Sequence, residues 1–348
     1  MFDINTPRIG FACKFMHSDQ SKPKKQLEEL QRPLNTKTTT VQWLNKQSVS
    51  VAEQRLWDLM CHNINSFKRL VKYVKMLPPN RRMVRLGSDC LPVYTHEDWR
   101  YFWQRPDVVA YCESNFAEVG EIARAHDVRL SFHPGQFTVL ASDNDDIVAR
   151  SIEEFEYHVN MARWMGFGRT FQDFKINVHI AGKRGPQGIR DAMQRMSPEA
   201  RNTLTIENDE NKWGVEHSLE LVNDCALVLD IHHHWAREGE YIYPTDDRYK
   251  RMIDSWRGVR PVIHYSYSRN EHLPADFAHD DFPDMGALIE AGHKKAKLRA
   301  HSDFYPNETV NEWALQFLNT ADIMCESKMK NLASKPLHKQ AIDLGIIK

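Results

Sequence analysis

Short apolar runs alternate with longer amphipathic segments along the whole chain, and this alternation limits the fold more than any other feature. Strands that alternate with helical patterns indicate βαβ units and a parallel sheet. Eight such units predict a TIM (β/α)8 barrel, with a doubly wound open sheet as the competing topology. The apolar runs are Arg8–Cys13, Met83–Gly87, Val128–Phe132, Lys175–His179, Thr203–Glu207, Ala226–Asp230, Pro261–His264 and Ala321–Glu326. The helical patterns are Val51–Met76, Asp107–His126, Asp146–Met165, Gly185–Ala200, Val215–Asn223, Asp246–Trp256 and Thr309–Phe317.

Two long segments, 17–50 and 266–301, stand outside this alternation. They follow the first and the seventh predicted strand, at the barrel end where active sites are built. No linker or internal repeat divides the 348 residues, so we expect a single barrel domain over 1–348 with these two insertions. Insertions of this length after strands usually carry function.

Composition excludes several classes of protein. The chain is 10% aromatic and has a formal net charge of −1, which excludes a disordered chain. No apolar stretch approaches the ~20 residues of a membrane span. The first residues lack the apolar core of a signal peptide, so we expect a cytoplasmic protein that does not bind membranes.

Six consecutive predicted strands end in an imidazole or a carboxylate. One such residue usually caps a turn, but six at the same rim of a barrel would crowd like charges and neutral imidazoles together. Bound cations resolve that crowding, because they supply the opposing charge. The residues are His133, His179, Glu207, Asp230, His264 and Glu326, with His233 close behind the sixth strand.

The donor set constrains the metal. Imidazole and carboxylate ligands without clustered thiolates suit Zn²⁺, Mn²⁺, Fe²⁺ or Co²⁺. The candidates are too many for one tetrahedral ion, so they predict two or three ions. Paired ions ~3.5–4 Å apart typically activate water and stabilise both oxygens of a phosphoryl displacement. The residues alone therefore predict a multi-metal hydrolase, with a metal-dependent sugar isomerase as the alternative.

Several motifs resemble those of the UV damage endonucleases. Leu130–Leu140 is similar to the HPGQ segment of that family, and Val84–Pro92 to its RxSSDLxP segment. Leu204–Asp209 and Leu229–His234 resemble the LExD and DxHH strands of the family. The segments Pro261–Ser266, His301–Asp303 and Asp322–Lys328 complete the set in the same order, so the resemblance runs from Arg8 to about Lys330.

The resemblance implies a xylose isomerase-like TIM barrel, related to endonuclease IV. It implies a DNA repair endonuclease that cuts double-stranded DNA immediately 5′ to cyclobutane pyrimidine dimers and 6-4 photoproducts by multi-metal-activated water. The implied cofactors are two or three divalent ions, with Mn²⁺ expected and Zn²⁺, Co²⁺ or Mg²⁺ as alternatives. We further expect a monomer, associated with the nucleoid in a prokaryote.

The resemblance also implies roles for individual residues. His133, His179 and a bridging Glu207 would hold one ion. A second ion would use Glu207, Asp230, His301 and Glu326, and a third His233 and His264. Of these, Glu207, His233 and His264 are the implied catalytic residues. Gln136 and Phe137 would probe the helix opposite the lesion, Phe11 takes another aromatic position of the family, and Arg85, Lys183 and Arg184 would contact DNA.

The chain departs from the family pattern at three places. The family usually has Tyr where Phe137 and Phe11 stand. It often has a lysine, sometimes carboxylated, at the position of Val262, and the two insertions here look longer. The alternatives that stay open are an AP endonuclease of the endonuclease IV type, which would cleave abasic sites alone, and the sugar isomerase, which would not bind DNA.

Overall fold

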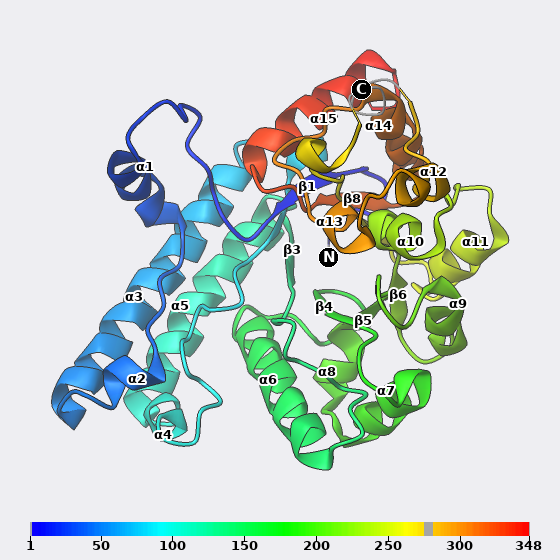
Figure 1. Ribbon diagram of the computed structural model, residues 1–348. Coiled ribbons are helices and arrows are strands. Elements are labelled where there is room, and N and C mark those ends of the chain that lie inside the picture. Colours follow the sequence, from blue (N-terminus) through cyan, green and yellow to red (C-terminus); the bar gives the residue numbers. More distant parts are fainter. Residues whose placement is uncertain (1, 275–280, 348) are drawn as a thin grey trace.

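Eight parallel strands form one sheet in the computed structural model, which describes residues 2–274 and 281–347. The strands lie at the centre and the helices outside them (Figure 1). Their order in the sheet is β6-β5-β4-β3-β2-β1-β8-β7, so neighbours in sequence are neighbours in space. The strands are β1 (Ile9–Ala12), β2 (Met83–Arg85), β3 (Arg129–Phe132), β4 (Lys175–His179), β5 (Leu204–Glu207), β6 (Ala226–Val228), β7 (Val262–Tyr265) and β8 (Asp322–Cys325).

The barrel closes between β6 and β7 at one end only. Among the described residues these strands share no ladder, and a single parallel bridge joins Asp230 to His264. The backbone N–H of His264 donates to the carbonyl of Leu229 over 2.9 Å. The TIM-barrel prediction is confirmed and the open doubly wound sheet is excluded. The closing bridge lies at two of the predicted metal ligands.

Most of the predicted helical patterns are confirmed with small shifts at their ends, but the pattern 215–223 is a short α-helix followed by a 3-10 helix, Leu219–Leu221. The pattern 185–200 is two helices, because Ser197 caps a new helix through its hydroxyl and Pro198 occupies its first position. The confirmed helices are α3 (Val49–Val74), α5 (Pro106–Ala125), α6 (Asp145–Trp164), α7 (Gly185–Arg195), α8 (Pro198–Thr203), α9 (Val215–Ser218), α11 (Asp247–Asp254) and α14 (Glu308–Leu315).

Two helices beside the strands were not predicted from the sequence. The run of three histidines was predicted as the end of the sixth strand, but it begins α10 (Ile231–Glu238), which Asp230 caps. The second is α15 (Asn331–Asp343), which packs beside β1 (Figure 1). The other helices that were not predicted are α1 (Lys24–Gln31), α2 (Val41–Leu44), α4 (Arg100–Trp103), α12 (Met285–Glu290) and α13 (Lys295–Leu298).

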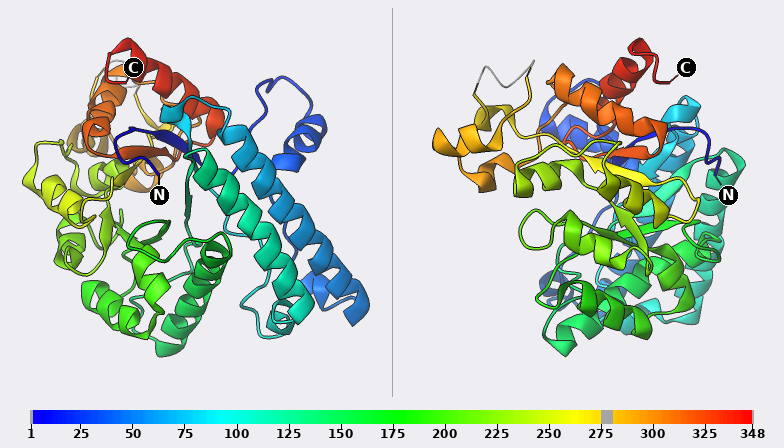
Figure 2. Two further views of the ribbon diagram at one scale, coloured as in Figure 1. Left: turned by 180° about the vertical axis from the view of Figure 1, so that it is seen from behind. Right: turned by 90° about the vertical axis from the view of Figure 1, so that its right-hand side faces the viewer.

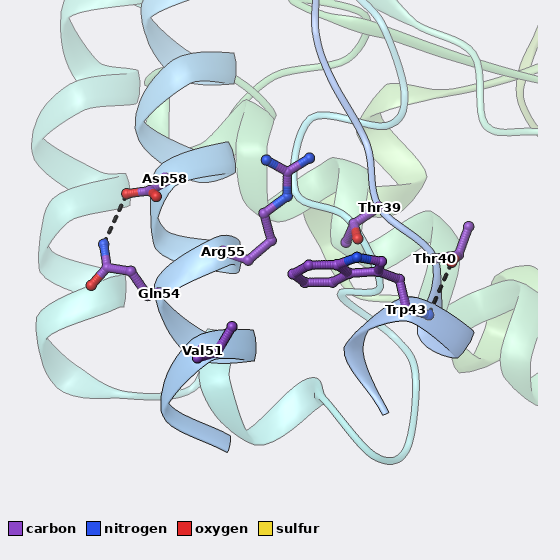
Figure 3. A pocket seen from close by; sticks show the side chains of 7 residues that line it. All are labelled: Thr39, Thr40, Trp43, Val51, Gln54, Arg55 and Asp58. Carbon is purple, nitrogen blue, oxygen red and sulfur yellow. Dashed lines mark hydrogen bonds between the residues drawn. The ribbon is translucent and has the colours of Figure 1, made fainter. Parts of the chain in front are cut away.

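The first insertion, 17–50, contains α1 and α2. Together with the start of α3 they extend away from the strands (Figure 1 and Figure 2, left). A hollow of about 720 Å³ lies between α2 and α3 (Figure 3), where the Arg55 guanidinium stands 5.8 Å from the centre of the Trp43 ring. None of the predicted site residues lines this hollow. In the second insertion, 275–280 lies outside the described residues.

A buried ionic cluster occupies the opposite end of the barrel from the predicted metal ligands. The carboxylate of Asp322, at the start of β8, accepts from the Arg129 Nη1 at 2.8 Å and the Arg260 Nε at 2.7 Å. It also accepts from the backbone N–H of Arg8 at 2.9 Å. Asp322 and Arg8 are fully buried, so this carboxylate holds together the start of β1, β3 and β8 and the residue before β7. In the described part of the chain no helix is both long and apolar enough to cross a membrane.

Candidate metal centre

The predicted ligands meet at the carboxyl ends of the strands, around Glu207. Glu207 is the last residue of β5 and pairs in register with His179 at the end of β4. Its Oε2 lies 3.3 Å from the Nε2 of His133, which follows β3. Its Oε1 lies 3.1 Å from the Nδ1 of His264 on β7 and 3.4 Å from the Nδ1 of His233 on α10. The carboxylate of Glu207 is thus the point at which four elements of the barrel rim come together.

Among the described residues, four groups of side chains have ligand atoms close enough to share an ion. The atoms within each group lie within 4.8 Å of one another. Three of the groups share a residue with the next, so the ligands form one continuous cluster. The groups are His133–His179–Glu207, His179–Glu210–His233, Glu207–Asp230–His233 and Asp230–His264–Glu326.

Buried polar atoms without a hydrogen bond mark this cluster as a cation site. Asp230 uses Oδ1 to cap α10, accepting from the N–H groups of His232 and His233, while its Oδ2 has no hydrogen-bond partner. The Oε1 of Glu207 and the Nδ1 of His264 lie 3.1 Å apart but form no hydrogen bond with any described residue. Such atoms are costly to bury unpaired. The residues therefore fit divalent cations, which would pair with these lone pairs.

Hydrogen bonds outside the cluster orient the ligands. The Nδ1 of His133 lies 2.9 Å from the carbonyl of Pro134, which fixes this nitrogen as a donor and leaves Nε2 free to bind a metal. The Asn177 amide donates to the Oε2 of Glu207, and Asn177 in turn accepts from the Thr205 hydroxyl at 2.8 Å. These contacts hold the ligands in place before any ion binds.

The charges in the cluster shift its pKa values in opposite directions. Burial raises the pKa of Asp230 well above its usual value, and the charges of Glu207 and Glu326 add to the shift. Burial also acts to raise the pKa of Glu207, but the imidazoles of His264 and His179 outweigh it and hold that pKa well below normal. Burial lowers the pKa of His264 to about 4, so this imidazole is neutral and can bind a metal at neutral pH.

His233 behaves differently from the other imidazoles. Burial acts to lower its pKa, but the carboxylates of Asp230, Glu207 and Glu210 outweigh it and raise the pKa to about 9. At neutral pH the metal-free protein therefore holds a proton on His233. That proton must leave before His233 can bind a metal.

This proton predicts a pH-dependent metal affinity. Below about pH 9 one proton leaves His233 for each ion bound there, so we expect the apparent affinity for Mn²⁺ to rise by about tenfold per pH unit and to level off above that pH. Isothermal titration calorimetry in buffers of different ionisation enthalpy would count the released proton. His233→Asn should weaken the dependence, and an affinity for the wild type that does not change between pH 6 and pH 9 would contradict this account.

The three histidines at the start of α10 point to different neighbours. His233 faces the Glu207 and Glu210 carboxylates, with its Nε2 3.7 Å from the Oε2 of Glu210. His234 lies 3.1 Å from Glu240. His232 stacks on Trp235. Only the middle histidine of the run joins the cluster, as the resemblance implied.

His301 lies beside the cluster without sharing any of its four groups. Its ring centre is 6.4 Å from that of His233, and its Nδ1 is 3.2 Å from the carbonyl of Glu326. Ser268 and His301 form an antiparallel bridge that ties this loop to the end of β7. The ligand role implied for His301 therefore stays a prediction.

Two residues near the cluster were missed from the sequence. Glu210 follows the β5 motif by three residues and shares a group with His179 and His233. Lys175 begins β4, and its buried Nζ crosses the barrel to lie 2.9 Å from the Nε2 of His264. Burial lowers the pKa of Lys175 to about 7. The lysine that Val262 replaces is thus absent from β7, but a lysine from another strand contacts the same histidine.

The residues predicted to contact DNA are placed differently from one another. Gln136 and Phe137 are both exposed on the loop after β3, and Phe137 is 85% exposed. Lys183 and Arg184 follow β4 and pair with Asp143 and Asp191, Lys183 at 2.7 Å. The DNA contact expected of these two residues stays a prediction.

Arg85 and Phe11 are not surface residues. The guanidinium of Arg85 is largely buried and pairs with Glu326, so it belongs to the metal cluster's surroundings. Phe11 is 1% exposed and packs in the hydrophobic core, on β1 between Val84 and Cys325 in the register. The DNA contact predicted for Phe11 is therefore corrected. Its ring is buried among other apolar side chains of the core, so it is not available to bind DNA.

Comparison with known proteins identifies the family. The family model described as "UV-endonuclease UvdE" matches residues 7–345. A UV DNA damage endonuclease of Bacillus velezensis is 28% identical over 267 residues, which cover 73% of this chain and 78% of the relative. One of Bacillus cereus (strain B4264) is 23% identical over 309 residues, covering 85% and 86%. The crystal structure of SacUVDE has the same fold, with a TM-score of 0.72, 20% identity and coverage of 98% of this chain and all of that one. With its ligand cluster at the barrel rim and a family match over nearly its whole length, the chain belongs to the UV-endonuclease UvdE family of DNA repair endonucleases.

Proposed function

We propose that this protein cuts double-stranded DNA immediately 5′ to UV photolesions, both cyclobutane pyrimidine dimers and 6-4 photoproducts, by hydrolysis at a centre of two or three divalent ions. The observation that carries the proposal is the continuous cluster of four ligand groups around Glu207, with unpaired buried atoms on Glu207, Asp230 and His264. A cluster of this size exceeds the needs of a single structural ion. It suits a phosphodiester, whose attacking and leaving oxygens both need stabilisation.

Different residues of the chain would hold different ions in this reaction. Divalent ions bound here would supply an activated water and neutralise the charge that grows on the phosphate. His133, His179 and Glu207 would hold one ion, while Asp230, His264 and Glu326 form a second group across the closing bridge. The neutral imidazole of His264 and the ionised carboxylate of Glu207 are already in the protonation states that metal binding needs. We propose Mn²⁺ as the ion, on the donor set and the family's implication, and a monomeric single domain as the active form.

Lesion recognition would use the exposed tip of the loop after β3. Phe137 offers a large apolar face to solvent and is more exposed than any other large hydrophobic side chain that the structure describes. Bases stack on such rings with little sequence preference. A dimerised pair stacks poorly and costs less to displace than an intact pair, so a probe at this site reads distortion of the helix.

Removing the ring of Phe137 tests its role in lesion recognition. Phe137→Ala should lower incision of a duplex with a single thymine dimer by roughly tenfold, because one stacking contact is worth about 1–3 kcal/mol. Phe137→Tyr keeps the ring and should retain the wild-type rate. Since Phe137 packs on little in the free protein, the thermal midpoint should not change. Equal incision by the alanine variant and the wild type would rule out a probing role for Phe137.

A nicking assay tests the proposed function. The substrate is an end-labelled duplex with one thymine dimer, incubated with the protein and Mn²⁺, and compared with the undamaged duplex and one with an abasic site. We expect a single cut immediately 5′ to the dimer, with a 3′-hydroxyl end, that chelation of the metal abolishes. Cleavage confined to the abasic duplex would replace the proposal by an AP endonuclease.

A further inference from the structure

Lys330 has a backbone conformation that lysine rarely adopts. Its φ of 51° and ψ of −119° place it in the region of the first central residue of a type II′ turn, where glycine is usual. A side chain in this region strains the backbone. The strain is held by hydrogen bonds on both sides: the N–H of Met329 donates to Asp303, and the carbonyl of Lys330 accepts from Ser334 at 3.0 Å.

Glycine would satisfy this turn at lower conformational cost, so the lysine side chain needs a reason of its own. It makes no hydrogen bond or ion pair with any residue that the structure describes, and it caps no N–H of α15. Neither pairing nor capping within the described residues therefore accounts for the lysine.

The surroundings of Lys330 belong to the metal cluster. Lys330 follows β8 by five residues and Glu326 by four. Arg85 pairs with Glu326, and its Nε donates to the Cys13 Sγ at 3.4 Å. Burial lowers the pKa of Lys330, and Cys13, Arg85 and Glu326 are among the groups whose charges act on it. The charge of Arg85 is balanced by Glu326. The ammonium group of Lys330, in contrast, pairs with no carboxylate that the structure describes.

We propose that Lys330 binds a backbone phosphate of the DNA strand to be cut, on the β1 and β8 side of the metal cluster. This inference rests on the proposed function. A phosphodiester carries one negative charge and accepts hydrogen bonds from an ammonium group, which matches the charge that Lys330 leaves free. The backbone around Lys330 is fixed beside the loops that follow β1 and β7, because the Asn331 amide bonds the backbone of Met16 and the N–H of Met329 donates to Asp303. On this inference, the chain keeps a lysine there because the phosphate contact is worth more than a relaxed turn. Lys330 is a substrate-binding residue, distinct from the metal ligands.

Two variants separate the phosphate contact from the strain. Lys330→Gln removes the charge, and Lys330→Gly removes both the charge and the strain. Single-turnover incision of the thymine-dimer duplex at several enzyme concentrations gives a half-saturating concentration and a maximal rate. We expect both variants to raise the half-saturating concentration about tenfold at moderate salt. The slope of its logarithm against log[KCl] should fall by about 0.9, the value for one lost phosphate contact.

The remaining readouts test what a purely structural role would change. Lys330→Gly should raise the thermal midpoint by about 2 °C, because the strain is relieved. Both variants should bind as much Mn²⁺ as the wild type, and Lys330→Arg should restore affinity. Lys335→Gln, an exposed lysine on the same helix, is the matched control and should leave the salt slope unchanged.

The outcomes are distinct. An unchanged half-saturating concentration and salt slope in Lys330→Gln would overturn the inference, and so would a loss that appears only as lost Mn²⁺. If the wild type itself does not incise the damaged duplex, the proposed function fails. If the wild type incises and the Lys330 variants match it, only this inference fails.

Discussion

Glu207→Gln is expected to lower the single-turnover rate of incision on the order of 10³-fold. The carboxylate lies among the Nε2 of His133 and the Nδ1 atoms of His233 and His264, and it belongs to two of the four ligand groups. Glutamine keeps the volume but replaces an anionic oxygen by an amide N–H₂, which repels a cation. A loss of this size corresponds to several kcal/mol of transition-state stabilisation, as expected when a shared metal ligand is removed.

A matched control separates this effect from a general loss of structure. Glu199→Gln makes the same change on an exposed pair with Arg163, on α8, and should leave incision within twofold of the wild type. Glu207→Gln should also bind fewer Mn²⁺ ions at equilibrium dialysis, while its far-UV circular dichroism stays the same. Retention of full Mn²⁺-dependent nicking by Glu207→Gln would falsify the assignment of Glu207 as the shared ligand.

Asp322→Asn is expected to lower the free energy of unfolding by about 3–5 kcal/mol, because it leaves buried guanidinium groups without their carboxylate. Asp322 is fully buried and pairs with Arg129 at 2.8 Å and with Arg260 at 2.7 Å. Of the arginines around it, Arg8 keeps a second partner, Asp127, at 2.6 Å. The loss is a large part of the stability of an ordinary domain, so the variant should be largely unfolded at moderate denaturant.

Chemical denaturation measures this change, with Asp247→Asn as the control. Asp247 pairs with Lys250 at 2.8 Å on the surface of α11 and is 90% exposed, so its loss should change the free energy of unfolding by less than about 0.5 kcal/mol. The Asp322 cluster lies at the end of the barrel away from the ligands, so residual folded protein should bind Mn²⁺ normally. Equal stability of both variants would show that the ionic cluster does not hold the strands together.

The strands of this fold could be predicted from the sequence because each is a short apolar run bounded by polar turns. β4 was predicted with the bounds that the structure shows, and the other strands within a few residues. α10 was missed because its first turn is a run of polar histidines after Asp230, which looks like the end of a strand. α15 was missed because Pro336, a residue that usually ends a helix, interrupts its apolar pattern.

The ligands of the metal cluster could be predicted because strand ends of a parallel barrel meet at one rim. Residues that reach the site from the start of a strand or from a loop could not be predicted in this way. Lys175 begins its strand and crosses the barrel to His264, and Glu210 reaches His233 from a loop. The strain at Lys330 is a property of the folded backbone and leaves no pattern in the sequence. Phe11 was predicted to contact DNA from its position in a motif, but it is buried. A motif position alone does not distinguish an exposed ring from a buried one.

Anomalous diffraction from crystals grown with Mn²⁺ tests most directly whether these side chains form a multi-ion centre. Data collected at the manganese absorption edge locate the ions independently of any assumption about function. We expect two or three peaks at the barrel mouth, with the Glu207 carboxylate bound to two of them and with His133, His179 and Asp230 among their ligands. Crystals in which Mn²⁺ occupies only surface carboxylates, with no peak beside Glu207, would contradict the account.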